Sequence, residues 1–213
     1  MSSPVALVTG ASSGIGAALA VKFAAEDFDL ILTARQEDKL NELKQELNNV
    51  DVFSVPMDLA TDEGIDQLCR AIEDAGLSVN VLVNNAAIFN QEPFIDASTE
   101  TIMRIMSLNM TAVARLTHHF VQHMIKHRSG RILNVASLAS FHPVPGMDLY
   151  AATKAFVLSM TESLAENLKG TGVSVTALCP GLTDTDALDR RIAGSLPPFL
   201  IAQAEQVANE GFD

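Results

Sequence analysis

A tyrosine and a lysine four residues apart form the pair in this sequence best suited to chemistry on a carbonyl group. Tyr150 and Lys154 open a helical stretch, and Ser137 precedes the tyrosine by 13 residues. Side chains four apart on a helix are neighbours on one face. A nearby ammonium favours the phenolate, so we expect Lys154 to lower the pKa of Tyr150 from its usual value of about 10. Tyr150 could then act as a general acid and base, while Ser137 holds the same substrate oxygen. Taken alone, such a pair also occurs by chance at the start of a surface helix.

A glycine-rich loop near the N-terminus has the form that holds the phosphates of a dinucleotide. It follows the apolar run of residues 5–8 and leads into a helical pattern, so it joins a strand to a helix. Its first glycine allows a sharp turn, its second lets the backbone approach a pyrophosphate, and its third lets the helix pack closely on the strand. The phosphates would face the free N–H groups at the start of that helix. The residues that we assign to this contact are Gly10, Ser12, Ser13, Gly14, Ile15 and Gly16.

The same loop also fits the Gly-x-Ser-x-Gly pattern of the nucleophile elbow in α/β-hydrolases. That elbow follows earlier strands, one of which supplies part of the oxyanion hole. Here the match follows the first predicted strand of the chain, so we reject the hydrolase reading.

The candidate residues need a fold that brings the ends of several strands together. Short apolar segments alternate with helical patterns along the whole chain. The predicted strands are residues 5–9, 29–33, 51–55, 79–83, 131–135 and 173–178, and the predicted helices are residues 14–26, 36–48, 61–75, 98 to about 127, and 150–169. The alternation predicts one α/β domain of the Rossmann type over residues 1–213, a doubly wound parallel sheet with strand order 3-2-1-4-5-6. Ligands of such sheets lie beyond the carboxyl ends of the strands, so the residues that follow each strand are candidates.

Two charged residues follow the second and third strands and bear on the choice of cofactor. Arg35 stands where an acidic residue would bind the ribose hydroxyls of NAD, so it favours NADP, whose 2′-phosphate matches a guanidinium. Arg35 could instead be a solvated residue beside Glu37 and Asp38. Asp58, which precedes Leu59, could accept a hydrogen bond from the adenine amino group or be an ordinary loop residue.

Taken together, these motifs resemble those of the short-chain dehydrogenase/reductase family. The resemblance covers residues 4–185. The resemblance rests on these motifs: the glycine-rich loop with its Thr9-Gly10 start, Asn84-Asn85-Ala86-Ala87 after the fourth strand, Asn109, Ser137, Tyr150 with Lys154, and Cys179-Pro180-Gly181. The family implies hydride transfer between the nicotinamide of NADP(H) and a carbonyl or alcohol carbon.

The resemblance implies a role for each matched residue. Tyr150 would be the general acid, or the base in the reverse direction, and Lys154 would also contact the nicotinamide ribose. Asn109, near a kink in its helix, would help hold a water in a proton relay. The other residues that the resemblance places against the cofactor are Arg35, Asp58, Leu59, Asn85, Ala86, Ala87, Pro180, Gly181, Thr183 and Thr185. Asn84 could instead be structural, and Pro180-Gly181 an ordinary turn.

The sequence departs from the family pattern at two places. Ala87 replaces the usual glycine of Asn-Asn-Ala-Gly, and the chain stops at Asp213 without the usual final helix and seventh strand. We expect residues 186–204 to form a lid over the substrate. We also expect a homodimer through the helices around residues 110–127 and 151–168, while the short C-terminus argues against a tetramer. The apolar residues that could serve this dimer, or face the sheet instead, are Leu116, Phe120, Phe156 and Met160.

Composition limits the partners. The 213 residues carry a net charge of −12 with no basic cluster, so we expect no nucleic-acid partner. The sequence shows no signal peptide and no apolar stretch long enough for a transmembrane helix, so we expect no membrane partner. It has two cysteines, which we expect to be free thiols in the reducing cytoplasm. His119, His123 and His127 share a helix face, but no carboxylate or cysteine is near them in the sequence. We therefore expect no metal site there.

Apolar residues in the predicted loops bear on the substrate. They predict a hydrophobic carbonyl or alcohol compound, with His142 at the rim of its pocket. These residues are Phe89, Leu138, Phe141, Met147 and Leu182. The alternative function is a non-catalytic redox sensor on the same fold. We favour the enzyme because a sensor need not keep Asn109, Ser137, Tyr150 and Lys154 together.

Overall fold

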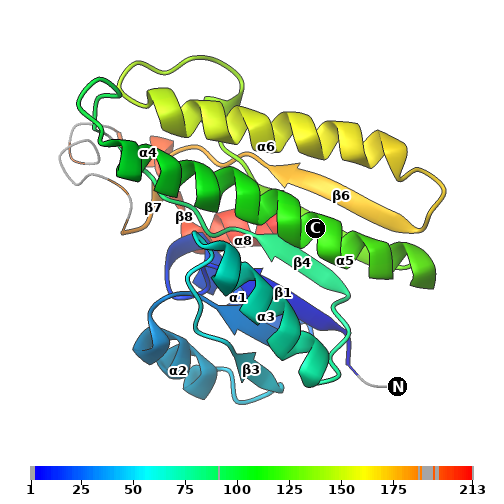
Figure 1. The fold of residues 1–213 in the computed structure, drawn as a ribbon. Coiled ribbons are helices and arrows are strands. Elements are labelled where there is room, and N and C mark those ends of the chain that lie inside the picture. The colour runs from blue at the N-terminus through cyan, green and yellow to red at the C-terminus, as the bar shows by residue number, and fades with distance from the viewer. Residues whose placement is uncertain (1–2, 91, 187, 189–193, 195–196, 213) are drawn as a thin grey trace.

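The predicted sheet is present, with six parallel strands in the order β3-β2-β1-β4-β5-β6 (Figure 1). The computed structural model describes residues 3–90, 92–186, 188, 194 and 197–212. The strands of the sheet are β1 (Val5–Thr9), β2 (Asp29–Thr33), β3 (Val52–Ser54), β4 (Val81–Asn84), β5 (Gly130–Val135) and β6 (Val173–Leu178). The α-helices are α1 (Gly14–Ala25), α2 (Glu37–Glu46), α3 (Asp62–Asp74), α4 (Thr99–Met106), α5 (Val113–His127), α6 (Asp148–Asn167) and α8 (Ala204–Phe212), and short 3₁₀ turns lie at η2 (Leu138–Ser140) and η3 (Pro198–Leu200). The strand order confirms the doubly wound, Rossmann-type arrangement.

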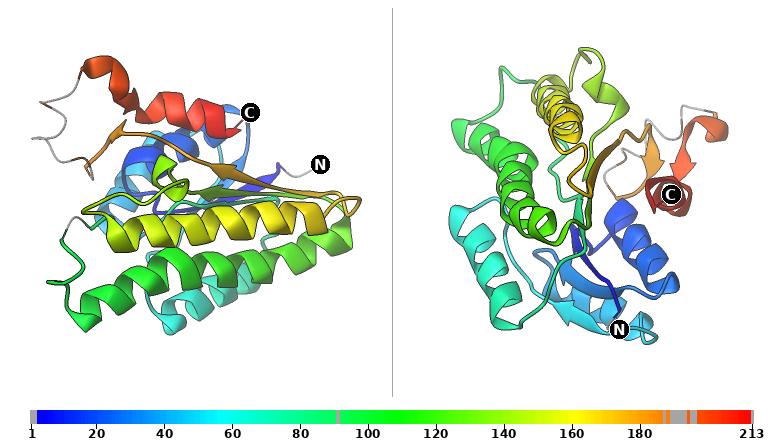
Figure 2. Two further views of the ribbon diagram at one scale, coloured as in Figure 1. Left: turned by 90° about the horizontal axis from the view of Figure 1, so that it is seen from above. Right: turned by 90° about the vertical axis from the view of Figure 1, so that its right-hand side faces the viewer.

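Helices cover both faces of the sheet, which explains why its inner strands are apolar on both sides. One face packs against α1, α2 and α8, and the other packs against α3, α5 and α6 (Figure 2). Along β1, Ala6 and Val8 contact the first layer and Leu7 contacts the second, so the whole strand is buried. Within the described residues, no helix is both long and apolar enough to cross a membrane.

The helix predicted from residue 98 to about 127 is interrupted. It begins as α4 after Ser98, whose hydroxyl accepts a hydrogen bond from Thr101 N at 3.0 Å, and it ends as α5. Between them, Ser107–Ala112 form a π-helical segment, η1. Such segments bend a helix and are frequent at functional sites. Asn109 lies in η1, so the irregularity expected beside it is present.

The chain after β6 adds a small second sheet and a last helix. β7 (Thr183–Asp184) pairs in parallel with β8 (Ala202–Gln203), which brings the two ends of the predicted lid together. Of that lid, residues 186–204, the segments 187, 189–193 and 195–196 lie outside the described residues. α8 packs on α1, where the rings of Phe212 and Phe23 meet edge-on at 5.0 Å. Among the residues that the structure describes, β6 is an edge strand of the main sheet, as expected without a seventh strand.

Two of the four residues considered for a dimer contact face the sheet. Leu116 and Phe120 on α5 are 1% and 6% exposed and belong to the core. Phe156 and Met160 on α6 are partly buried and pack against a small cluster around Val157. A contact between copies through α5 would therefore use other residues of that helix.

Candidate active site

A cavity of about 640 Å³ opens at the carboxyl ends of the strands. Its size falls within the range of small-molecule and cofactor sites. Of the catalytic and cofactor-binding residues proposed from the sequence, all line this cavity except Gly16 and Asn109. The fold therefore brings the predicted cofactor residues and the predicted catalytic residues to one place, although they are spread from residue 10 to residue 185.

The glycine-rich turn is shaped by close approach of the backbone. Gly10 has a φ of +67°, which side chains rarely adopt, and a Cβ on it would lie 2.8 Å from Asn85 Nδ2. A Cβ on Gly16 would lie 2.3 Å from Gly10 O, inside contact distance. Gly16 thus lies behind the cavity wall, where it lets α1 pack against the turn. These are the positions where the predicted dinucleotide loop needs glycine.

The loop after β4 is bound to the loop after β1 through Thr9. The hydroxyl of Thr9 accepts hydrogen bonds from the backbone N–H groups of Asn85 and Ala86, at 2.9 and 3.0 Å. The Asn85 side chain donates in turn to Thr9 O at 2.9 Å. Asn85 therefore holds the two loops together, while Ala86 and Ala87 line the cavity. The sequence identified Thr9 only as the start of a motif, and its anchoring role appears only in three dimensions.

Arg35 and Asp58 both line the cavity, and the charge of Arg35 acts on Asp58. The backbone N–H of Met57 donates to Ala34 O at 3.0 Å, which continues the pairing of β2 with β3 and sets Asp58 one residue beyond the position opposite Arg35. Asp58 receives hydrogen bonds from Arg104 Nη2 at 2.7 Å and from Ala60 N at 3.1 Å. Burial opposes ionisation of Asp58, but these bonds and the charges of Arg104 and Arg35 outweigh it, so the pKa of Asp58 is lowered. The sequence did not indicate that Arg104, 46 residues away, would be its partner.

Tyr150 is largely enclosed, and its pKa moves against the expectation from the sequence. The ring of Phe89 meets the Tyr150 ring edge-on at 4.9 Å. Burial raises the pKa of Tyr150 above 10, and a hydrogen bond with Ser137 offsets this only in part. The expected lowering by Lys154 is wrong for this structure, because Lys154 Nζ lies 5.8 Å from the centre of the tyrosine ring. A shared helix face brought the two residues near, but it did not aim the ammonium at the phenol.

Lys154 points its ammonium at the backbone of the sheet. Nζ donates to Val135 O at 2.6 Å, and the residue is 4% exposed. Burial lowers the pKa of Lys154 to about 8, while Cys179 acts in the opposite direction. Lys154 is therefore a buried cation at neutral pH whose charge is easily lost.

Asn109 is fully buried and holds the loop after β4. Its Oδ1 accepts from Ile88 N at 2.8 Å, and its Nδ2 donates to Ile88 O at 3.0 Å and to Thr153 Oγ1 at 3.1 Å. The Thr153 hydroxyl donates to Tyr150 O at 2.8 Å. Asn109 thus joins the cavity loop to the helix that carries Tyr150. Its part in holding a water stays a prediction. Nothing in the sequence indicated the part played by Thr153.

The loops after β5 and β6 close the site. The Ser137 hydroxyl accepts from Ala139 N at 3.1 Å, and Leu138 N donates to Pro180 O at 2.9 Å. The Thr183 hydroxyl donates to Gly181 O at 3.2 Å. Thr185 reaches back to the glycine-rich turn, since a Cβ on Gly14 would lie 3.0 Å from its methyl group.

Apolar side chains form part of the cavity wall. Phe89, Leu138, Met147 and Leu182 line it as predicted, together with His142. Phe141 is not among the lining residues and is 61% exposed. Further apolar lining residues are Ile88, Leu108, Val144 and Leu188.

The two other polar features singled out in the sequence lie away from the cavity. Asn84 Nδ2 donates to Asn134 Oδ1 at 2.8 Å and to Thr117 Oγ1 at 3.0 Å, in a buried network that ties the sheet to α5. The histidine face of α5 pairs His119 with Glu73 across a gap of 3.3 Å. Over the described parts of the chain, no group of three histidine, cysteine or acidic side chains could hold a metal ion.

Comparison with known proteins places this arrangement in a family. A family profile described as short chain dehydrogenase matches residues 4–194. The uncharacterized oxidoreductase YvaG of Bacillus subtilis is 35% identical over 196 residues, which is 90% of this chain and 73% of that protein. Among solved structures, a short-chain dehydrogenase from Sphingobium yanoikuyae in complex with NADPH has a TM-score of 0.88 and 32% identity, covering 97% of this chain and 82% of that one. L-Sorbose reductase from Gluconobacter frateurii, complexed with NADPH and L-sorbose, has a TM-score of 0.88 and 30% identity, covering 99% and 88%.

The profile match spans most of the chain, and the relatives share its fold over nearly its whole length. The chain therefore belongs to the short-chain dehydrogenase/reductase family of oxidoreductases.

Proposed function

We propose that this protein is an NADP(H)-dependent oxidoreductase that interconverts a carbonyl group and an alcohol. The observation that carries the proposal is the position of Tyr150, which lies in one cavity with Ser137, Lys154 and the glycine-rich turn. Family membership supports it, and so do two similar structures that were solved in complex with NADPH.

The cavity fits a phosphorylated dinucleotide. Gly10 and Gly16 put no side chain at the two closest contacts of the turn, so the start of α1 can present its N–H groups to a pyrophosphate. Arg35 has no ion pair among the residues that the structure describes, although it lines the same cavity. A guanidinium in that state suits the 2′-phosphate that distinguishes NADP from NAD. Asp58, which lines the same cavity, could hold the adenine amino group.

The chain's own residues would handle the proton. When bound, NADPH supplies the hydride for the carbonyl carbon. Tyr150 donates its hydroxyl proton to the carbonyl oxygen, and Ser137 donates a hydrogen bond to the same atom. Because the pKa of Tyr150 is raised, its phenol is protonated at neutral pH, which is the form that reduction needs. Lys154, whose ammonium is held at Val135 O, would contact the nicotinamide ribose. Asn109 links the Ile88 loop, through Thr153, to the helix that carries Tyr150.

Four further features complete the proposal. The apolar part of the cavity wall suits a hydrophobic substrate, and the segment between β7 and β8 would cover it as a lid. We propose a homodimer of single-domain chains. Cys69 and Cys179 are free thiols, which suits the reducing cytoplasm.

The test is loss of NADPH absorbance with a panel of apolar aldehydes and ketones, run beside NADH and the Tyr150→Phe variant. We expect turnover with NADPH that falls by about a thousandfold in Tyr150→Phe, since the variant lacks only the proton donor. NADPH affinity of the variant should stay within about twofold of wild type, because a phenyl ring keeps the packing. Full activity in Tyr150→Phe would refute the role of Tyr150. Tight NADPH binding by wild type without turnover on any substrate would favour the redox sensor.

A further inference from the structure

Helix α4 sets a cation against the wall of the cofactor cavity. Arg104 Nη2 lies 2.7 Å from Asp58 Oδ2, and the two side chains are 38% and 35% exposed. Arg104 does not itself line the cavity, whereas Asp58 does. Whatever Arg104 does for a bound cofactor must therefore act through Asp58.

Asp58 and the 2′-phosphate of the cofactor would compete for the same partner, Arg35. The pairing of Met57 N with Ala34 O sets Asp58 one residue beyond the position opposite Arg35, and both residues line the same cavity. The positive charge of Arg35 contributes to the lowered pKa of Asp58, so the two groups attract one another. An unrestrained Asp58 carboxylate would pair with Arg35 and would repel a phosphate dianion at that position.

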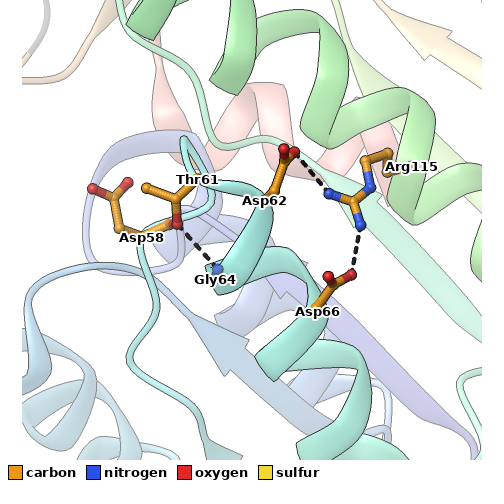
Figure 3. Close-up of polar contacts among 6 residues, drawn as sticks. All are labelled: Asp58, Thr61, Asp62, Gly64, Asp66 and Arg115. Carbon is orange, nitrogen blue, oxygen red and sulfur yellow. Dashed lines mark hydrogen bonds and ion pairs between the residues drawn. The ribbon is translucent and has the colours of Figure 1, made fainter.

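The structure holds Asp58 in another arrangement. Its Oδ1 accepts from Ala60 N at 3.1 Å, while Arg104 takes Oδ2. The backbone of Asp58 is fixed as well, because Thr61 Oγ1 donates to Asp58 O at 2.9 Å and accepts from Gly64 N at 3.0 Å to cap α3 (Figure 3). Both carboxylate oxygens thus have hydrogen-bond partners other than Arg35, and in the described residues Arg35 is left without an ion pair.

We propose that Arg104 is a specificity-determining positioning residue, which holds the Asp58 carboxylate so that Arg35 stays available for the 2′-phosphate of NADP(H). The inference rests on the proposed function, since it concerns the same cofactor. It makes the preference for NADP(H) a property of three residues from three segments and not of Arg35 alone.

The test compares dissociation constants for NADP⁺ and NAD⁺ by calorimetry on the full chain. In Arg104→Gln we expect the affinity for NADP⁺ to fall about tenfold, while that for NAD⁺ changes by less than about twofold. Arg104→Lys, which keeps the charge, should retain most of the preference. Adding Asp58→Asn to Arg104→Gln should restore NADP⁺ binding, because the competing carboxylate is then gone.

Arg115→Gln is the matched control. Arg115 on α5 pairs with Asp62 and Asp66 on α3 (Figure 3), and it is not among the residues that line the cavity. Its loss removes a cross-helix arginine of the same kind, and it should leave the affinity for both cofactors unchanged.

The outcomes separate the two claims. Wild type that binds NAD⁺ as tightly as NADP⁺ would overturn the cofactor assignment of the proposed function, and this inference with it. Wild type that prefers NADP⁺, with an unchanged ratio in Arg104→Gln, would overturn this inference alone. Equal weakening of both cofactors without recovery in the double variant would also overturn it, because Arg104 would then only stabilise the fold.

Discussion

Replacing Lys154 by methionine should make the free energy of unfolding less dependent on pH. Lys154 is 4% exposed, and its ammonium donates to Val135 O. Burial lowers its pKa to about 8, from 10.5 in the unfolded chain. Well below about pH 8, both the folded and the unfolded chain carry this proton, so Lys154 adds no pH dependence. Between about pH 8 and pH 10.5 only the unfolded chain keeps the proton, so the free energy of unfolding rises with pH.

The size of the effect follows from the two pKa values. One proton is worth about 1.4 kcal/mol for each pH unit inside this window. From about pH 8 to about pH 9.5, Lys154 should therefore add about 2 kcal/mol to the free energy of unfolding. Methionine is of similar length and carries no proton, so Lys154→Met should lack this gain. Loss of the hydrogen bond to Val135 O lowers the free energy of unfolding of Lys154→Met by about 1–3 kcal/mol at every pH. This loss cancels when the change between two pH values is taken within one protein.

The assay is urea unfolding, followed by circular dichroism, at about pH 6.5 and about pH 9.5. The control is Lys44→Met, which removes an exposed lysine from α2. Between the two pH values, the free energy of unfolding of wild type and of Lys44→Met should each rise by about 2 kcal/mol more than that of Lys154→Met. An equal gain in all three proteins would refute the reasoning, since Lys154 would then titrate as it does in the unfolded chain.

Two further predictions concern the surroundings of Tyr150. The sequence has one tyrosine and no tryptophan, so tyrosinate absorbance reports Tyr150 alone. The folded protein should titrate above pH 10 and the urea-unfolded chain at about 10, whereas a folded midpoint below that value would show that Lys154 lowers the pKa. Asn109→Ala should lower the free energy of unfolding by about 2–4 kcal/mol, because it removes three hydrogen bonds, two to the part-buried backbone of Ile88 and a buried one to Thr153. The exposed Asn41→Ala should cost less than about 0.5 kcal/mol in the same urea titration, and an equal loss in both variants would contradict this account.

The sheet could be read from the sequence because its signals are local. Each buried strand is a short apolar run, each helix shows its own periodicity, and glycines mark the turn after β1. The carboxyl ends of parallel strands meet at one edge, so Arg35, Asp58, Ser137 and Thr183 could be placed together without a structure.

Features that depend on side-chain direction or on distant contacts could not be read in this way. Helical spacing put Tyr150 and Lys154 on one face, but the carbonyl of Val135 decides where the ammonium points. The apolar residues of α5 suited a partner or the sheet equally well, and only packing shows that Leu116 faces the sheet. The partner of Asp58 lies on another helix, and nothing near it in the sequence points to Arg104.

The central claim is that Tyr150 protonates a carbonyl oxygen while hydride arrives from NADPH. The most direct measurement is mass spectrometry of the alcohol formed from an apolar ketone with NADPH deuterated at C4 of the nicotinamide. Wild type should deliver one deuterium to the carbinol carbon from one of the two labelled cofactors, pro-R or pro-S, and none from the other. Tyr150→Phe should bind the cofactor but form almost no product. Tight binding of NADPH by wild type with no deuterium in any alcohol would contradict the account and identify the cavity as a sensor site.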